Sequence, residues 1–161
     1  MEQMRIHVAG ARGPAADQGN LLPEVALLEK RHSVTIQFFR ADRVFGAEHL
    51  VSAAEKAVRA MDNGTNMART LGMEMLLYVA AERQTSEALR KLGIFPGAEQ
   101  MALVIVGNVS ADSVLEELGL ERDDSVLDPA GKDPSVFGIP AGTENAPDLV
   151  LERVAVSEVF R

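Results

Sequence analysis

Side chains that could perform catalysis are few in this chain and do not cluster along it. The chain has no Cys, which excludes a thiolate nucleophile, a disulfide and a Cys-ligated zinc site, and its three His are widely spaced. Two acidic pairs, Glu116-Glu117 and Asp123-Asp124, consist of adjacent residues whose side chains point apart on a helix, so they indicate a solvated acidic surface. We therefore expect no catalytic residue, no metal and no cofactor.

Sequence motifs for phosphate binding or nucleophilic chemistry are also missing. The chain contains neither a Gly-x-x-x-x-Gly-Lys-Ser/Thr run nor a Gly-x-Ser-x-Gly elbow. Residues 10–13, Gly-Ala-Arg-Gly, are interpreted as a turn after a strand. They lack the Gly-x-Gly of a dinucleotide fingerprint, so phosphate binding there is the minor alternative. His49 falls at the edge of the polar arc of a predicted helix, where an exposed His without a catalytic role is favoured.

The charge of the chain is unevenly distributed. Its 161 residues carry a formal net charge of −8, which argues against the broad basic face that duplex nucleic acids require. Residues 1–91 hold 12 Lys and Arg against 11 Asp and Glu, whereas residues 92–161 hold 4 against 13. A binding site for an anion is therefore expected in the first 91 residues.

Length and composition are typical of one globular domain spanning residues 1–161. The chain is 47% hydrophobic and 25% charged, which is ordinary for a chain that folds around a core. The N-terminal residues lack the apolar core of a signal peptide, and no run of 18 apolar residues occurs. We therefore expect a cytoplasmic protein without a membrane-spanning segment.

The hydrophobic pattern predicts a small sheet. Residues 3–8 and 33–39 alternate polar and apolar side chains, as half-buried strands do. Residues 101–107 form a continuous aliphatic run, which is typical of a central strand covered on both faces. With the helices described next, this pattern predicts an α/β fold of the α+β type, in which several helices pack on a small central sheet.

Helical periodicity is clearest in residues 46–61, with a short helix predicted at residues 23–29 and another between Ser110 and Gly119. Residues 121–147 are rich in acids and prolines and are predicted to be loops. The terminal helix, residues 149–160, has polar residues that do not share one arc. We expect it to be covered by more than its own domain.

Residues 67–81 are apolar around nearly the whole circumference of a helix. A buried helix capped by Thr65 is favoured, while a strand over residues 73–79 remains an alternative. Residues 82–84 form a polar corner before a second helix, residues 86–92. That helix places apolar side chains on one face and charged side chains on the other: Ala88, Leu89 and Leu92 against Glu87, Arg90 and Lys91.

This helix pair carries a resemblance to a known family. Asn66-Met67-Ala68, Met73-Glu74-Met75-Leu76-Leu77-Tyr78, Glu82-Arg83-Gln84 and Ala88-Leu89-x-x-Leu92-Gly93-Ile94 together resemble the signature of the small regulatory subunit of the KEOPS complex, in its archaeal type. The family includes the PRPK-binding protein of animals. The resemblance covers most of residues 34–160 and is most specific from Glu-x-Leu-Leu-Tyr to Arg-Gln.

The resemblance implies a non-catalytic subunit. Such a subunit binds and stimulates a kinase-like ATPase, and recruits tRNA through its single-stranded CCA end for threonylcarbamoyladenosine modification. An interaction module of the same fold that does not bind tRNA is the alternative. The net charge and Thr85 allow this alternative, because the family usually carries Ile after the Arg-Gln pair.

The resemblance also implies site residues. Those expected to contact RNA are Arg83, Gln84, Thr85, Asn66 and Arg69. Arg90 and Lys91 are expected beside this corner. On the residues alone, Arg83 instead pairs with Glu82 or Glu87, and Gln84 caps the helix.

Two further sets of residues are assigned. Glu74 and Tyr78 are expected to be structural, with the Glu74 carboxylate holding Arg83 or a backbone amide at the corner. The terminal helix has more apolar residues than one core-facing stripe requires, so part of it is expected to bind the kinase-like partner. The residues chosen for that contact are Val150, Val154 and Ser157.

Overall fold

Strand β3 (Gln100–Val106) is the central strand that its aliphatic run predicts. In the computed structural model, which describes residues 5–13 and 18–159, β3 pairs antiparallel with β1 (Ile6–Arg12) and with β2 (Thr35–Arg40). The two-residue strand β4 (Glu121–Arg122) adds to β1, giving the order β2-β3-β1-β4. Residues 101–106 of β3 are all buried.

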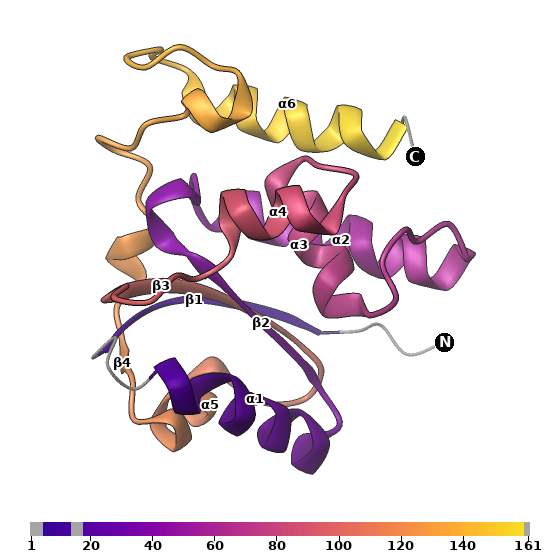
Figure 1. The fold of residues 1–161 in the computed structure, drawn as a ribbon, viewed down its shortest axis with the longest axis vertical. Helices are drawn as coiled ribbons and strands as arrows, with labels where there is room; N and C mark the ends of the chain where they lie inside the picture. The colour runs from indigo at the N-terminus through magenta and orange to yellow at the C-terminus, as the bar shows by residue number, and fades with distance from the viewer. Residues whose placement is uncertain (1–4, 14–17, 160–161) are drawn as a thin grey trace.

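Helices cover both faces of the sheet (Figure 1). On one face lie α1 (Gln18–His32) and α5 (Ala111–Leu118). On the other face lie α2 (Ala47–Asn63), α3 (Leu71–Ala80) and α4 (Thr85–Leu92), with α6 (Ala146–Val159) packed on their far side. The architecture confirms the predicted α+β fold, and each side of the sheet has its own hydrophobic core.

The first strand is longer at its C-terminal end than predicted. Gln3 and Met4 of the predicted strand lie outside the described residues. Gly10 to Arg12, interpreted from the sequence as a turn, continue β1 because they pair with residues 100–102 of β3. Gly10 fits there because it has no Cβ, which would overlap the carbonyl oxygen of Asp123. Helix α1 likewise extends beyond the predicted 23–29 and contains Pro23.

Residues 71–80 are helical, so the strand alternative is wrong. The helix begins later than expected because Thr70, not Thr65, is its cap: the Thr70 side-chain oxygen accepts a hydrogen bond from the Met73 N–H at 3.2 Å. It ends at Ala81, which has a φ of 54°. Gly64, in the left-handed region, ends α2 as its type predicts, and Ser110 caps α5.

His49 is buried, which corrects the expectation of an exposed side chain. Its Nδ1 accepts a hydrogen bond from the Phe45 N–H at 3.0 Å, and its Nε2–H donates to the Val79 carbonyl oxygen at 2.8 Å. The Phe137 ring packs edge-on against it. The helical wheel could not predict this burial, because a later segment of the chain covers this side of α2. Burial lowers the pKa of His49 to about 4.

This buried His makes the fold sensitive to mild acid. The folded-state pKa lies below that of an unfolded His, so between these values the unfolded chain binds the proton and acid favours unfolding. We expect the free energy of unfolding to fall by about 2 kcal/mol from pH 7.5 to pH 5. Urea denaturation at several pH values measures it. H49Q should flatten the slope, and equal slopes in both proteins would contradict this assignment.

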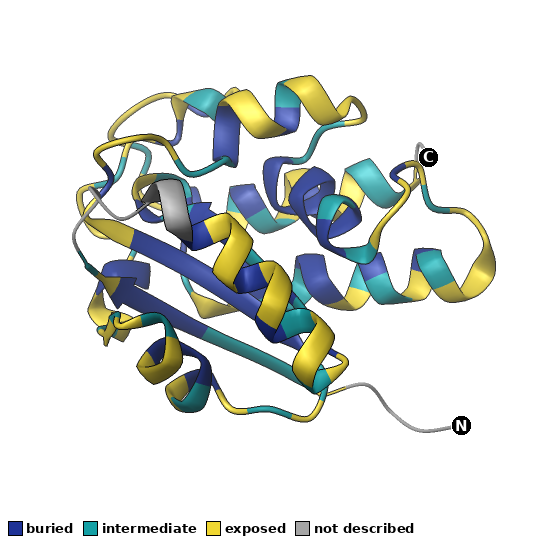
Figure 2. Ribbon diagram, turned by 60° about the horizontal axis from the view of Figure 1, so that its bottom comes forward, coloured by how far each residue is buried: buried dark blue, intermediate teal, exposed yellow. Residues whose placement is uncertain are grey.

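The acidic segment after β4 is largely irregular, as its composition predicts. It contains the 3₁₀ helices η3 (Asp124–Leu127) and η4 (Ser135–Phe137). Lys132 connects this segment to the residues before α2, because its Nζ donates a hydrogen bond to the Val44 carbonyl oxygen at 2.7 Å. The same Nζ donates to the Val126 carbonyl oxygen within the segment at 2.6 Å. Partial burial lowers the pKa of Lys132 to about 8. Figure 2 shows that the helices keep exposed outer faces while the sheet between them is mostly buried.

Candidate functional site

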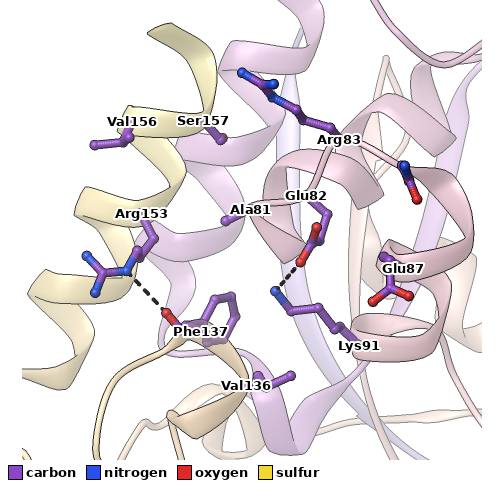
Figure 3. Close-up of a pocket in the computed structure, with 11 residues that line it drawn as sticks. Ala81, Glu82, Arg83, Glu87, Lys91, Val136, Phe137, Arg153, Val156 and Ser157 are labelled. Atoms are coloured by element: carbon purple, nitrogen blue, oxygen red, sulfur yellow. Dashed lines mark hydrogen bonds and ion pairs between the residues drawn. The ribbon is translucent and has the colours of Figure 1, made fainter. Parts of the chain in front are cut away.

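A groove of about 630 Å³ lies between the corner that joins α3 to α4 and the helix α6 (Figure 3). It brings together Arg83 and Gln84, expected to contact RNA, and Ser157, expected to contact the kinase-like partner. The lining residues are Ala81, Glu82, Arg83, Gln84, Glu87, Lys91, Val136, Phe137, Arg153, Val156 and Ser157.

The corner presents its polar residues because the backbone reverses direction within a few residues. The Ala81 N–H bonds to the Tyr78 carbonyl oxygen, and the Glu82 N–H bonds to that of Leu77, which closes α3. Helix α4 starts three residues later. Arg83 and Gln84 are therefore exposed between two helix ends. Gln84 occupies the N-cap position, but its side chain makes no capping hydrogen bond. The prediction that the Gln84 side chain caps α4 is therefore wrong.

Lys91 is buried at the base of the groove rather than exposed on the polar face of α4. Its Nζ donates to the Ala80 carbonyl oxygen and to Glu82 Oε1, both at 2.9 Å, and lies 5.3 Å from the centre of the Phe137 ring. Leu89, expected on the apolar face, is instead half exposed. Helix α4 therefore buries Lys91 together with Ala88 and Leu92, which its pattern of apolar and charged residues does not predict.

Glu87 and Arg90 form an ion pair on the surface of α4. The distance between Glu87 Oε2 and Arg90 Nη2 is 2.8 Å, and this hydrogen bond lowers the pKa of the Glu87 carboxyl. Glu82 is bonded to Lys91 in the same way. Glu82 and Glu87 therefore each form an ion pair with a cation of α4. The polar wall of the groove therefore contains both carboxylates and cationic side chains.

The opposite wall comes from α6 and from η4. Arg153 Nε donates to the Phe137 carbonyl oxygen at 3.1 Å, which joins α6 to the acidic segment. Val156 is 44% exposed, and the Ser157 hydroxyl donates to the Val154 carbonyl oxygen within the helix. Arg153 forms no ion pair within the part of the chain that the structure describes. The sequence does not predict the place of Arg153 in the groove, because no local motif relates it to a corner 70 residues earlier.

The other residues expected to contact RNA are outside the groove. Asn66 and Arg69 precede α3, at the opposite end of a ten-residue helix from the corner, about 15 Å away along its axis. The Asn66 side-chain amide donates to the Ala68 carbonyl oxygen, and Arg69 is exposed. Thr85 is exposed as the first residue of α4. Only Arg83 and Gln84 of this set line the groove.

Glu74 and Tyr78 lie inside the core. The Glu74 Oε1 atom accepts hydrogen bonds from the N–H groups of Met67 (2.9 Å) and Ala68 (2.8 Å). These amides belong to the loop before α3 rather than to the corner after it, which corrects the position expected for this contact. Glu74 is fully buried and Tyr78 is 1% exposed. Both residues therefore support the helix from within rather than facing a ligand.

Val150 and Val154 are also in the core, which corrects their assignment to a partner surface. Each has no exposed area, because α6 packs this side against α2 and α3. The large apolar side chains that α6 leaves exposed are Val156 and Val159, the latter 75% exposed.

Residues 5–13 and 18–159 hold neither a cluster of metal-ligating side chains nor a helix fit to cross a membrane. No three His, Asp or Glu side chains gather there as metal ligands would. None of the helices described there combines the length and apolar character that a bilayer crossing needs.

Comparison with known families gives a match over most of the chain. The family model of the kinase binding protein CGI-121 matches residues 20–126, which include α2, α3, the corner and α4 but not α6. No curated protein matches the chain.

Proposed function

The chain belongs to the family of the kinase binding protein CGI-121, and we propose from this premise that it is a non-catalytic KEOPS subunit. In this role it binds a kinase-like ATPase, stimulates it, and recruits tRNA through the single-stranded CCA end for threonylcarbamoyladenosine modification. The observation that carries the proposal is the groove, because it joins the Arg83-Gln84 corner to α6.

The chemistry of the groove suits an unpaired RNA end. Single-stranded nucleotides need a cation for phosphate, hydrogen-bonding groups for base edges, and an apolar surface for the bases. Arg83 and Arg153 supply cations from opposite walls, Gln84 supplies an amide, and Val136 supplies apolar surface. A short single strand requires no wide basic face, so the net charge of −8 is compatible with this ligand.

The exposed end of α6 suits the kinase-like partner. Val156 and Val159 are the large apolar side chains that α6 leaves exposed, and exposed apolar residues on a helix favour a protein contact. Ser157, half buried between them, is the one residue of the sequence-based set that stays near this surface. We assign the partner contact to the last turns of α6.

A protein-interaction module without tRNA binding is the second candidate. One observation favours it: Thr85 exposes a hydroxyl at the start of α4, where the resemblance implies an Ile that would pack against a base. In that case the groove would bind a protein segment, and the chain would bind the kinase-like partner but no tRNA.

Reconstitution with the kinase-like ATPase tests the proposed function. We expect the two proteins to co-purify, and the rate of ATP hydrolysis by the partner to rise when this chain is added. The chain alone should hydrolyse no ATP. Absence of a complex, or ATP hydrolysis by the isolated chain, would reject the non-catalytic partner role.

A further inference from the structure

A second cationic surface lies beside the C-terminal half of α4. We name it the arginine strip and define it by Arg40, Arg43, Leu89, Arg90 and Phe95. Its residues come from the end of β2, the 3₁₀ helix η2 (Ala41–Arg43), α4 and the loop that follows α4. Phe95 is 40% exposed and Leu89 is 50% exposed, so two large apolar side chains face water on the segments that carry the three guanidinium groups.

Arg40 holds the aromatic side chain of the strip in place. Its guanidinium carbon lies 4.7 Å from the centre of the Phe95 ring. The same group makes two hydrogen bonds of 2.8 Å with the Asp42 carboxylate, which fix its plane and balance its charge. Arg40 therefore positions Phe95 rather than offering a free charge to a ligand.

Arg43 and Arg90 are the cations that a ligand can reach. Arg43 Nη1 donates to the Lys91 carbonyl oxygen at 2.9 Å, and Arg43 forms no ion pair with the described residues. Burial, and then the nearby charges of Arg40 and Arg90, lower the pKa of Arg43. The Arg90 side chain is 63% exposed, and its surface pair with Glu87 is of the weak kind that exchanges readily with other anions.

The strip continues directly from the groove. Glu87 lines the groove and bonds Arg90, while the Lys91 side chain lines the groove and its carbonyl oxygen bonds Arg43. A strand lying in the groove would therefore reach the strip by passing over the last turn of α4. Glu87 and Lys91 of the groove make this connection by bonding Arg90 and Arg43 of the strip.

We propose that the arginine strip binds the RNA strand that leads into the CCA end, with phosphates on Arg43 and Arg90 and a base against Phe95. This inference rests on the proposed function. The positive charge of the strip indicates the class of ligand, because grouped guanidinium groups in a protein of net charge −8 favour a polyanion. An exposed aromatic ring among cations is the usual surface for stacking a base.

The variants F95A and R90A test the strip on intact tRNA and on tRNA trimmed of its CCA end. We expect F95A to weaken binding of both RNAs by about 5-fold to 150-fold, the range that corresponds to loss of one stacked base. R90A should reduce the dependence of log affinity on log salt by about one phosphate contact. L27A, which removes an exposed apolar side chain from α1 on the other face of the sheet, is the control.

The outcomes separate the strip from the groove. R83E should lose its effect once the CCA end is removed, whereas F95A should keep its effect on trimmed tRNA. If wild-type protein binds tRNA and F95A binds it equally well, the strip proposal is wrong and the groove stands. If F95A weakens only the complex with the kinase-like ATPase, the strip is a protein surface and the proposal is also wrong. If wild-type protein binds no tRNA, the proposed function and the strip fall together.

Discussion

Replacing Arg83 by Glu should weaken tRNA binding by about 5-fold to 150-fold, because it inverts a charge on the polar wall of the groove. This range corresponds to the roughly 1–3 kcal/mol that a lost stacking or charge contact costs. Arg83 is exposed at the corner between α3 and α4, so the fold should tolerate the change. A filter-binding titration of tRNA measures the affinity.

A matched control separates the site from general charge repulsion. K30E changes the net charge by the same amount on α1, which lies on the other face of the sheet, and should leave tRNA affinity within about twofold of wild type. Arg153→Gln should also weaken binding, by less, since Arg153 contributes from the opposite wall. Equal loss in R83E and K30E would show that overall charge, not the groove, governs binding.

Replacing Val159 by Asp should abolish co-purification with the kinase-like ATPase while sparing tRNA binding. Val159 is 75% exposed on the last turn of α6 and does not line the groove, so the change should not disturb the fold or the RNA end. Burying a new charge in an apolar contact costs several kcal/mol, enough to remove a complex of moderate affinity. Pull-down and titration calorimetry measure the loss.

Two further substitutions of apolar residues serve as controls for V159D. V154D places a charge at a fully buried position and should unfold the protein, which circular dichroism would show. L22D makes the same type of change on the exposed side of α1, away from α6, and should bind the partner normally. A folded V159D variant that still binds the kinase at wild-type affinity would remove α6 from the partner surface and leave the corner around Arg83 as the next candidate.

Elements with their own hydrophobic period could be predicted from the sequence. The aliphatic run of β3 and the wheel of α2 identify their elements without reference to the rest of the chain. The Arg83-Gln84 corner follows from the polar interruption between two helical segments. The N-terminal strand extends beyond its predicted C-terminal end, since pairing with β3 carries it through Gly10, a residue whose type locally favours a turn.

Burial on the outer side of the helices could not be predicted, because it depends on contacts between distant segments. His49 and Lys91 looked polar and exposed on their own helices, yet the segment that carries Phe137 packs over both. Val150 and Val154 exceed the apolar residues that one core-facing stripe of α6 requires, and they are buried because α6 packs against α2 and α3. The groove could not be predicted for the same reason, since its two walls come from the corner and from the last helix, which are far apart in the sequence.

The most direct test of the account is one titration of wild-type protein with intact tRNA and with the same tRNA lacking its CCA end. If the groove holds the unpaired end, the trimmed tRNA should bind more weakly by about the factor that R83E costs, and R83E should bind both RNAs with similar affinity. Equal binding of intact and trimmed tRNA by the wild-type protein would contradict the account, because the groove would then hold no part of the CCA end.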